Sequence, residues 1–309
     1  MDRCHSESGT TGHAHAAGKT RHALLLGLAG VTVFGLTLPA TRLAVADLDP
    51  LFVTAGRSLL AAVFAAFTLL WARPQPPHRR EWLRLAAFSF FAIIGFPLLM
   101  AIAMRYAPAS HGAVVLAVLP LLTAMGGALV GGERPSLGFW ACGLAGSGAV
   151  LVYSLLTGGG SGELQWADIL LAGAALSAAA AYSLGGEMAR RIGGWEVICW
   201  ALVFSAPASL ALVVVSGPIN WSAGAPAWAG FLYVSLFSMF LGFFAWNKGL
   251  AMGGIARIGQ IQLLQPFVAL AASAALLGET VGRLEIVFAV LVVGIVALGW
   301  RMRVGGTAG

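Results

Sequence analysis

Two stretches of this sequence are alike: LPLLTAMGGALVGGER at 119–134 and QPFVALAASAALLGET at 265–280. Each has a proline inside an apolar run that leads to a Gly-Glu pair, with 13 residues from proline to glutamate (120 to 133, and 266 to 279). The two copies are 146 residues apart in a chain of 309 residues. Because similarity at a fixed offset is typical of a duplicated unit, the sequence predicts two halves of similar fold.

The composition around these stretches is that of a membrane protein. Apolar residues make up 59% of the chain, charged residues only 10%, and the mean hydropathy is +0.87. A helix needs roughly 20 mostly apolar residues to cross a bilayer, so the chain has room for about ten such helices joined by short loops. We predict them at 23–41, 51–71, 82–104, 108–131, 136–157, 166–188, 195–216, 227–250, 254–278 and 281–300.

The two halves are predicted to be inverted repeats. Five helices are an odd number, so the second half must begin on the opposite face of the membrane, as in many secondary transporters. The predicted fold is an all-α integral membrane protein with ten transmembrane helices, a first repeat at 23–157 and a second at 166–302. Residues 1–22 have little apolar surface to bury and are predicted to form a disordered cytoplasmic tail.

The distribution of Lys and Arg predicts the orientation. If the N-terminus is cytoplasmic, the outer loops hold only Arg42, Arg105 and Arg283, and the other loop cations fall on the cytoplasmic side. The positive-inside rule therefore places both termini in the cytoplasm. The segment 44–46 resembles a signal-peptide cleavage site, but Arg42 just before it and the helix count favour an uncleaved first span.

Several motifs together resemble the drug/metabolite transporter superfamily, and within it the proteins with two EamA-type domains. These motifs are Phe34-Gly35, Pro50 with Arg57, Leu119-Pro120, Gly132-Glu133-Arg134, AWNKGLA at 245–251, QIQLLQP at 260–266 and LGET at 277–280. The resemblance covers roughly residues 22–302 and departs from the family pattern at Gly131, where Leu is usual. It implies export or exchange of metabolites across the cytoplasmic (inner) membrane by alternating access.

Three glutamines in one predicted span are candidates for the substrate pathway: Gln260, Gln262 and Gln265. They lie just before Pro266, which frees a backbone carbonyl nearby. Gln262 and Gln265 are three residues apart and share a helical face. Polar side chains in a span either line a polar pathway or bond to neighbouring helices, and the sequence leaves both interpretations open here.

Arg57 is a further pathway candidate, because a cation inside a span is costly and its guanidinium suits a substrate carboxylate. Two other interpretations compete with this one. Its long side chain can snorkel to the outer interface, or it can pair with Asp47 or Asp49 at the start of the helix.

Two titratable residues are candidates for proton coupling. His111 lies near the outer start of a predicted span, and Glu187 lies near the cytoplasmic end of another. Histidine titrates near neutral pH, which suits this role. The alternatives are that His111 only forms a hydrogen bond at a helix end, and that Glu187 only pairs with Arg190 or Arg191 one turn away.

Aromatic and amide groups add to the predicted pathway. Trp246, Asn247 and Tyr182 lie within spans and are expected to form its walls, although Trp and Tyr also populate interfacial belts. No residues are expected to be catalytic, because the spans hold no paired aspartates or histidine cluster. No metal site is predicted, because the three cysteines are far apart and the tail histidines form no closed set of ligands.

Matched prolines and glutamates are expected to have structural roles. Pro39, Pro120 and Pro266 are predicted helix breaks and hinges. Glu133 and Glu279 each close a span, and we expect their carboxylates to cap the helix that follows.

The predicted function is secondary transport of amino acids, related metabolites or amphiphilic drugs. No Gly-x-x-x-x-Gly-Lys loop is present to bind ATP, and no cofactor is expected. The expected partners are a small-molecule substrate and the lipid bilayer, with nucleic acid excluded by the scattered cations and a homodimer left open. A membrane scaffold or receptor without transport is the main alternative, and an intramembrane enzyme is a more distant one.

Overall fold

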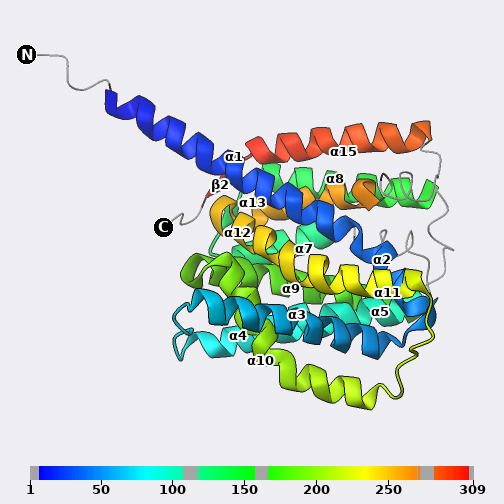
Figure 1. The fold of residues 1–309 in the computed structure, drawn as a ribbon. Helices are drawn as coiled ribbons and strands as arrows, with labels where there is room; N and C mark the ends of the chain where they lie inside the picture. The colour runs from blue at the N-terminus through cyan, green and yellow to red at the C-terminus, as the bar shows by residue number, and fades with distance from the viewer. Residues whose placement is uncertain are drawn as a thin grey trace, which may run out of the picture.

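The computed structural model describes residues 7–106, 116, 118–156, 166–269, 271 and 282–305. Nearly all of them are helical, and the helices lie side by side in one bundle (Figure 1). The elements are α1 Glu7–Gly35, α2 Thr37–Asp47, α3 Pro50–Ala72, α4 Glu81–Ser89, η1 Phe90–Gly95, α5 Phe96–Tyr106, α7 Leu119–Leu129, β1 Arg134–Pro135, α8 Leu137–Leu156, α9 Trp166–Ile192, α10 Gly194–Val215, α11 Ala225–Leu232, η2 Tyr233–Leu241, α12 Gly242–Gly253, α13 Ile255–Gly259, η3 Gln260–Leu264, α15 Arg283–Arg301 and β2 Val304–Gly305.

Six helical segments of the described chain are long and apolar enough to cross a membrane. They are Thr20–Asp47, Pro50–Ala72, Glu81–Tyr106, Trp166–Ile192, Gly194–Val215 and Ala225–Gly253. Shorter apolar helices cover Leu119–Leu129, Leu137–Tyr153 and Ile286–Arg301. The protein is therefore an all-α, multi-pass membrane protein.

The first span differs from the sequence prediction at its start. Helix α1 already begins at Glu7, so residues 7–22, which were expected to be disordered, continue the helix. This end of α1 projects beyond the bundle (Figure 1). The low apolar content of residues 7–22 indicates only that they have no core to pack against. A packed helix can still extend beyond the bundle, because each added residue forms one further backbone hydrogen bond.

Breaks in the helices fall at the three prolines singled out above. Helix α1 ends at Gly35 and α2 begins at Thr37, and Pro39 has no N–H to donate to the Gly35 carbonyl. Pro120 occupies the first turn of α7. The 3₁₀ segment η3 ends at Leu264, two residues before Pro266, which lies in the helical turn 265–269.

Two spans contain π-helical segments, η1 at Phe90–Gly95 and η2 at Tyr233–Leu241. Such segments are rare and leave backbone carbonyls free for other donors. In η1, the Phe91 carbonyl accepts a hydrogen bond from Ser177 Oγ at 3.0 Å. Moving 90–95 along the chain by the repeat offset of 146 gives 236–241, which lies within η2.

The packing of the helices pairs elements from the two halves of the chain. Helix α1 packs against α12, and α5 packs against α9. Three further pairs are α3 with α10, α7 with α13, and α8 with α15. Adding 146 to the bounds of α8 gives 283–302, and α15 covers Arg283–Arg301.

Small residues allow the closest of these approaches. A Cβ on Gly30 of α1 would lie 2.9 Å from Trp246 Cε3, and one on Gly249 of α12 would lie 3.1 Å from the Gly27 nitrogen. Glycine therefore sets the distance between α1 and α12. On the outside of the bundle, large apolar side chains such as Leu70 are exposed, which suits a lipid-facing surface.

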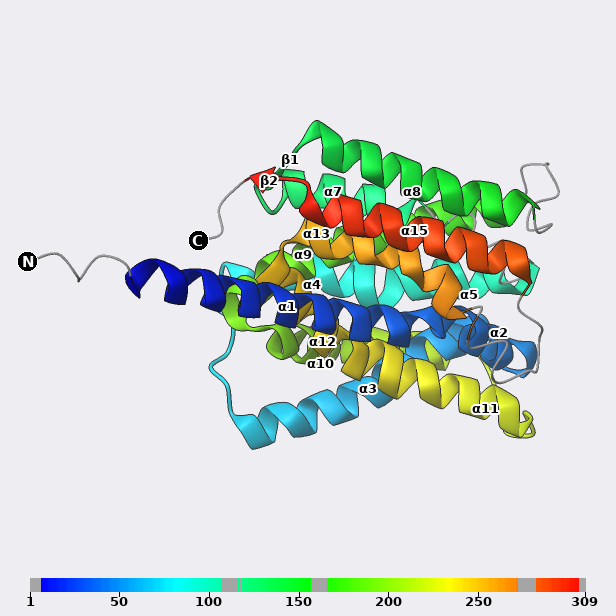
Figure 2. The same ribbon diagram turned by 90° about the horizontal axis from the view of Figure 1, so that it is seen from above.

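The start of α1 and the end of β2 lie at the same end of the bundle (Figure 2). The two short strands β1 and β2 pair antiparallel there, Arg134 with Gly305. The segment 73–80, which joins α3 to α4, also lies at this end, which we call the terminal end.

Candidate functional site

A cluster of aromatic rings fills the space between α1, α9 and α12. The ring of Phe34 lies 6.1 Å from Tyr182, 5.3 Å from Phe243 and 5.9 Å from Trp246, measured between centroids. Tyr182 and Trp246 lie edge to face at 5.2 Å. Because α1 belongs to the first half and α9 and α12 to the second, this aromatic cluster sits on the boundary between the halves.

Arg57 is buried in α3, with 2% of its surface exposed. Snorkelling to the interface is therefore wrong for this side chain. Pairing with the nearby aspartates is wrong as well: Asp49 caps α3 by accepting from the Leu51 nitrogen at 2.8 Å, and Asp47 accepts from the Gly224 nitrogen at 2.9 Å. Within the described part of the chain, Arg57 Nε has no hydrogen-bond partner.

The three glutamines predicted for the pathway have different surroundings. Gln265 Nε2 donates to the Phe34 carbonyl at 3.2 Å, at the break between α1 and α2. Gln260 Nε2 donates to the Phe139 carbonyl at 3.2 Å. Gln262 is 4% exposed, and neither its Nε2 nor its Oε1 meets a partner among the described residues.

Trp246 and Asn247, adjacent on α12, are both fully buried. Asn247 Nδ2 lies 3.4 Å from the Gly194 carbonyl, whereas Asn247 Oδ1 and Trp246 Nε1 are unpaired with any described residue. A buried polar group without a hydrogen bond costs about 1–3 kcal/mol. The interior of the bundle thus holds polar groups whose bonding capacity is unused.

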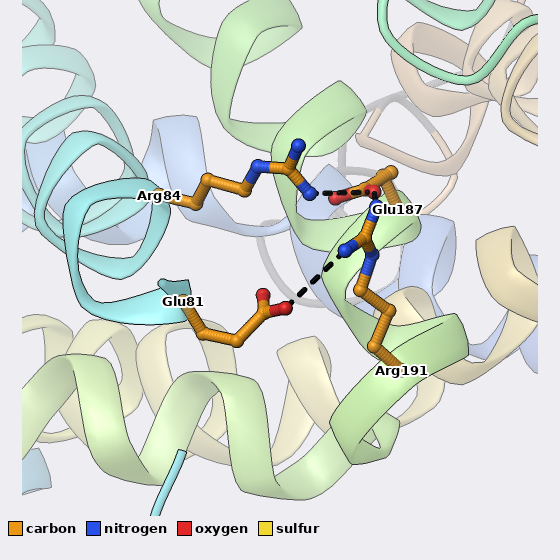
Figure 3. Close-up of polar contacts among 4 residues, drawn as sticks. All are labelled: Glu81, Arg84, Glu187 and Arg191. Carbon is orange, nitrogen blue, oxygen red and sulfur yellow. Dashed lines mark hydrogen bonds and ion pairs between the residues drawn. The ribbon is translucent and has the colours of Figure 1, made fainter. Parts of the chain in front are cut away.

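A network of four charged side chains joins α4 to α9 near the terminal end, shown in Figure 3. Glu187 Oε1 lies 3.0 Å from Arg84 Nη1 and 2.5 Å from Arg191 Nη2. Arg191 also reaches Glu81, with 3.3 Å between Nη1 and Oε1. Glu187 therefore pairs with Arg84 and Arg191 and not with Arg190, while His111 lies outside the described residues.

Glu133 caps a helix, but not the one that follows it. Its two carboxylate oxygens accept from the backbone nitrogens of Ile255 and Ala256 at 2.7 Å each, at the start of α13. Arg190 Nη2 lies 2.6 Å from the same carboxylate. The expectation that Glu133 caps the next helix in the chain is corrected, and Glu279 lies outside the described residues.

The EamA-like transporter family matches the sequence twice, at residues 21–155 and 165–300. The chain belongs to this family. It carries two EamA domains and is a multi-pass membrane transporter of the drug/metabolite type.

Known relatives of this EamA-family chain include two proteins of Bacillus subtilis (strain 168). The uncharacterized transporter YdeK is 45% identical over 265 residues, which cover 85% of this chain and 92% of YdeK. The uncharacterized transporter YvbV is 24% identical over 268 residues, which cover 84% of this chain and 85% of YvbV. A solved crystal structure shares the fold, with a TM-score of 0.72, 20% identity, and coverage of 89% of this chain and 95% of the other.

In this EamA-family structure, some predicted residues come together and others do not. Tyr182 and Trp246 meet in the aromatic cluster, and Gln265 reaches it through the Phe34 carbonyl. Glu187 belongs instead to the charged network near the terminal end. Sequence reasoning did not single out Thr54, whose buried Oγ1 has no partner in the described chain, although its place three residues before Arg57 puts both on one face of α3.

Proposed function

We propose that this protein is a secondary transporter that moves small organic metabolites across the cytoplasmic membrane by alternating access, with export as its direction. The observation that carries the proposal is the set of buried polar atoms that have no partner among the described residues: both amide atoms of Gln262, Trp246 Nε1 and Asn247 Oδ1. A bundle that served only as a scaffold would gain stability by replacing them with apolar groups. A transporter needs them, because its substrate supplies the missing partners.

The proposed architecture is ten helices arranged as two inverted five-helix repeats. Under the 146-residue offset, the counterpart of span 20–47 is α9, and the counterpart of span 81–106 is 227–252. A two-fold axis between the repeats would then turn the contact of α1 with α12 into the contact of α9 with α5, and both contacts occur. The matched positions of η1 and η2 support the same relation.

In this proposal the terminal end faces the cytoplasm. Arg73, Arg79 and Arg80 lie in or beside the segment that joins α3 to α4 there, and Arg134 lies in β1 at the same end. The positive-inside rule favours the cytoplasm for such a concentration of cations. The N-terminal segment and the end of the second domain would then both be cytoplasmic.

The substrate is expected to reach the polar groups when the helices separate at one end at a time. The charged network of Glu81, Arg84, Glu187 and Arg191 ties α4 to α9, so it would have to open for access from the cytoplasm. Transport is driven by the substrate gradient, by exchange or by protons. Proton coupling at Glu187 would be linked to the opening of these ion pairs, and His111 remains a second candidate.

The test is transport in reconstituted proteoliposomes with a panel of labelled amino acids and amphiphilic drugs. Gln262→Ala and Gln265→Ala are compared with wild type, and Leu70→Ala, on the exposed surface, is the matched control. We expect saturable flux of at least one compound, reduced in both glutamine variants and retained in the control. Absence of flux for every compound, with or without a pH gradient and with folded protein, would favour the non-transporting scaffold.

A further inference from the structure

The one buried cation of α3 points to the chemical class of the substrate. We propose that the site between the halves binds an organic monocarboxylate with an aromatic or branched apolar body, and that Arg57 is the residue that holds the carboxylate. The inference rests on the proposed transport function and adds the substrate class to it.

Arg57 lacks a counter-ion in the described part of the chain. Arg57 is 2% exposed, and no ion pair joins it to a carboxylate of the described residues. Asp47 and Asp49, the acidic residues nearest in sequence, are occupied by backbone N–H groups. Buried charges are otherwise paired, so a ligand must complete this site.

The unpaired polar groups buried in the bundle with Arg57 match the chemistry of a carboxylate. Thr54 Oγ1 and Trp246 Nε1 are buried and, like Arg57 Nε, have no partner among the residues described. The indole and guanidinium groups only donate hydrogen bonds, and a hydroxyl can donate one. An ionised carboxylate only accepts them, and it matches the guanidinium in a bidentate way.

The aromatic cluster defines the rest of the ligand. Ala61, one turn after Arg57 on α3, packs in the same core cluster as Tyr182 and Trp246, whose rings lie 5.2 Å apart. Phe34 and Phe243 complete the apolar side of the cluster. A ligand whose carboxylate meets Arg57 would therefore place its body against aromatic rings, which favours apolar over polar side groups.

The charge available in the interior limits the ligand to one negative charge. The repeat offset maps Arg57 onto Val203 of α10, the helix that packs against α3. The second half therefore supplies an apolar residue where the first half supplies a cation. A dicarboxylate or a phosphate dianion would leave a charge without a partner in this interior, whereas a monocarboxylate is neutralised by Arg57 alone.

The test measures ligand-induced thermal stabilisation of the purified full-length protein in detergent. The probes are 3-phenylpropanoate and 4-methylpentanoate, each compared with its own amide, together with 3-phenylpropylamine. The variants are Arg57→Gln, Arg57→Lys and, as a control, Arg105→Gln, which removes an exposed cation at the end of α5. We expect at least one carboxylate to stabilise wild type saturably and to bind about tenfold or more tightly than its amide, the ratio given by one charge-assisted hydrogen bond.

The variants separate a ligand-binding role from a structural one. Arg57→Gln should lose the preference for carboxylate, Arg57→Lys should keep part of it, and Arg105→Gln should keep all of it. Without ligand, Arg57→Gln should melt no lower than wild type, because it removes a buried charge that has no partner among the described residues. The proposal is overturned if no carboxylate binds better than its amide, if the amine binds as well, or if Arg57→Gln melts lower without ligand.

Failure of this inference and failure of the proposed function give different results. Saturable flux of a cationic or neutral compound that is unchanged in Arg57→Gln would leave the transporter standing and remove the carboxylate. Carboxylate binding that depends on Arg57, in a protein that moves no compound of the panel, would keep the binding site and remove the transport.

Discussion

Glu133 should be one of the most important single side chains for the stability of this bundle. It is 7% exposed and accepts from the Ile255 and Ala256 nitrogens at 2.7 Å each, while Arg190 Nη2 lies at 2.6 Å. Hydrogen bonds to a charged group contribute about 1.5–3 kcal/mol each. Arg190 is 28% exposed, so its ion pair adds about 1 kcal/mol or less. Glu133→Ala should therefore lower the free energy of unfolding by about 3–7 kcal/mol.

Glu133→Gln should lose about half of that amount, because an amide offers one acceptor oxygen where the carboxylate offers two. The assay is denaturant unfolding in mixed micelles, followed by tryptophan fluorescence. The matched control is Glu81→Gln, which removes the ion pair between Glu81 and Arg191. The Arg191 side chain is 48% exposed, so this pair should contribute less than about 1 kcal/mol. A Glu133→Ala variant no more destabilised than this control would show that the hydrogen bonds from Glu133 to α13 contribute little to the stability of the bundle.

Three further changes have expected outcomes. Gln262→Leu removes two buried polar atoms that have no partner among the described residues. It should therefore raise the free energy of unfolding by about 1 kcal/mol and reduce flux. A lower free energy of unfolding would show that these atoms are paired in the folded protein. Gly30→Ala places a Cβ 2.9 Å from Trp246 and should cost about 1–3 kcal/mol in the same assay, whereas Gly148→Ala, with nothing within 4 Å, should be near neutral. Two reporters are fused in turn after Arg303, one active only in the cytoplasm and one active only on the outer face. The first should give a signal and the second none, and a signal from the second would reverse the proposed orientation.

The broad architecture was accessible from the sequence because it depends on local patterns. Long apolar runs predicted membrane-crossing helices, and the described segments match them in place, for example Trp166–Ile192 for the run at 166–188. Pro120 and Pro266 were recognisable as break points because proline removes a backbone donor wherever it occurs.

The partners of polar side chains were not accessible in this way. The sequence placed Asp47 and Asp49 near Arg57, but it could not show that both aspartates are occupied by backbone nitrogens. In the same way, Glu133 was recognised as a cap, while its target at Ile255 lies 122 residues away along the chain. Such contacts depend on how distant helices pack, which apolar periodicity does not specify.

The most direct test of alternating access is the accessibility of position 54 from the two faces of the membrane. Thr54→Cys is made in a variant without the native cysteines, and an impermeant thiol reagent is applied to right-side-out and inside-out vesicles. Thr54 is 1% exposed in this structure, so labelling reports opening of the bundle. Alternating access predicts labelling from both faces, slowed by a saturating transported compound. Labelling from only one face, or from neither, would contradict it.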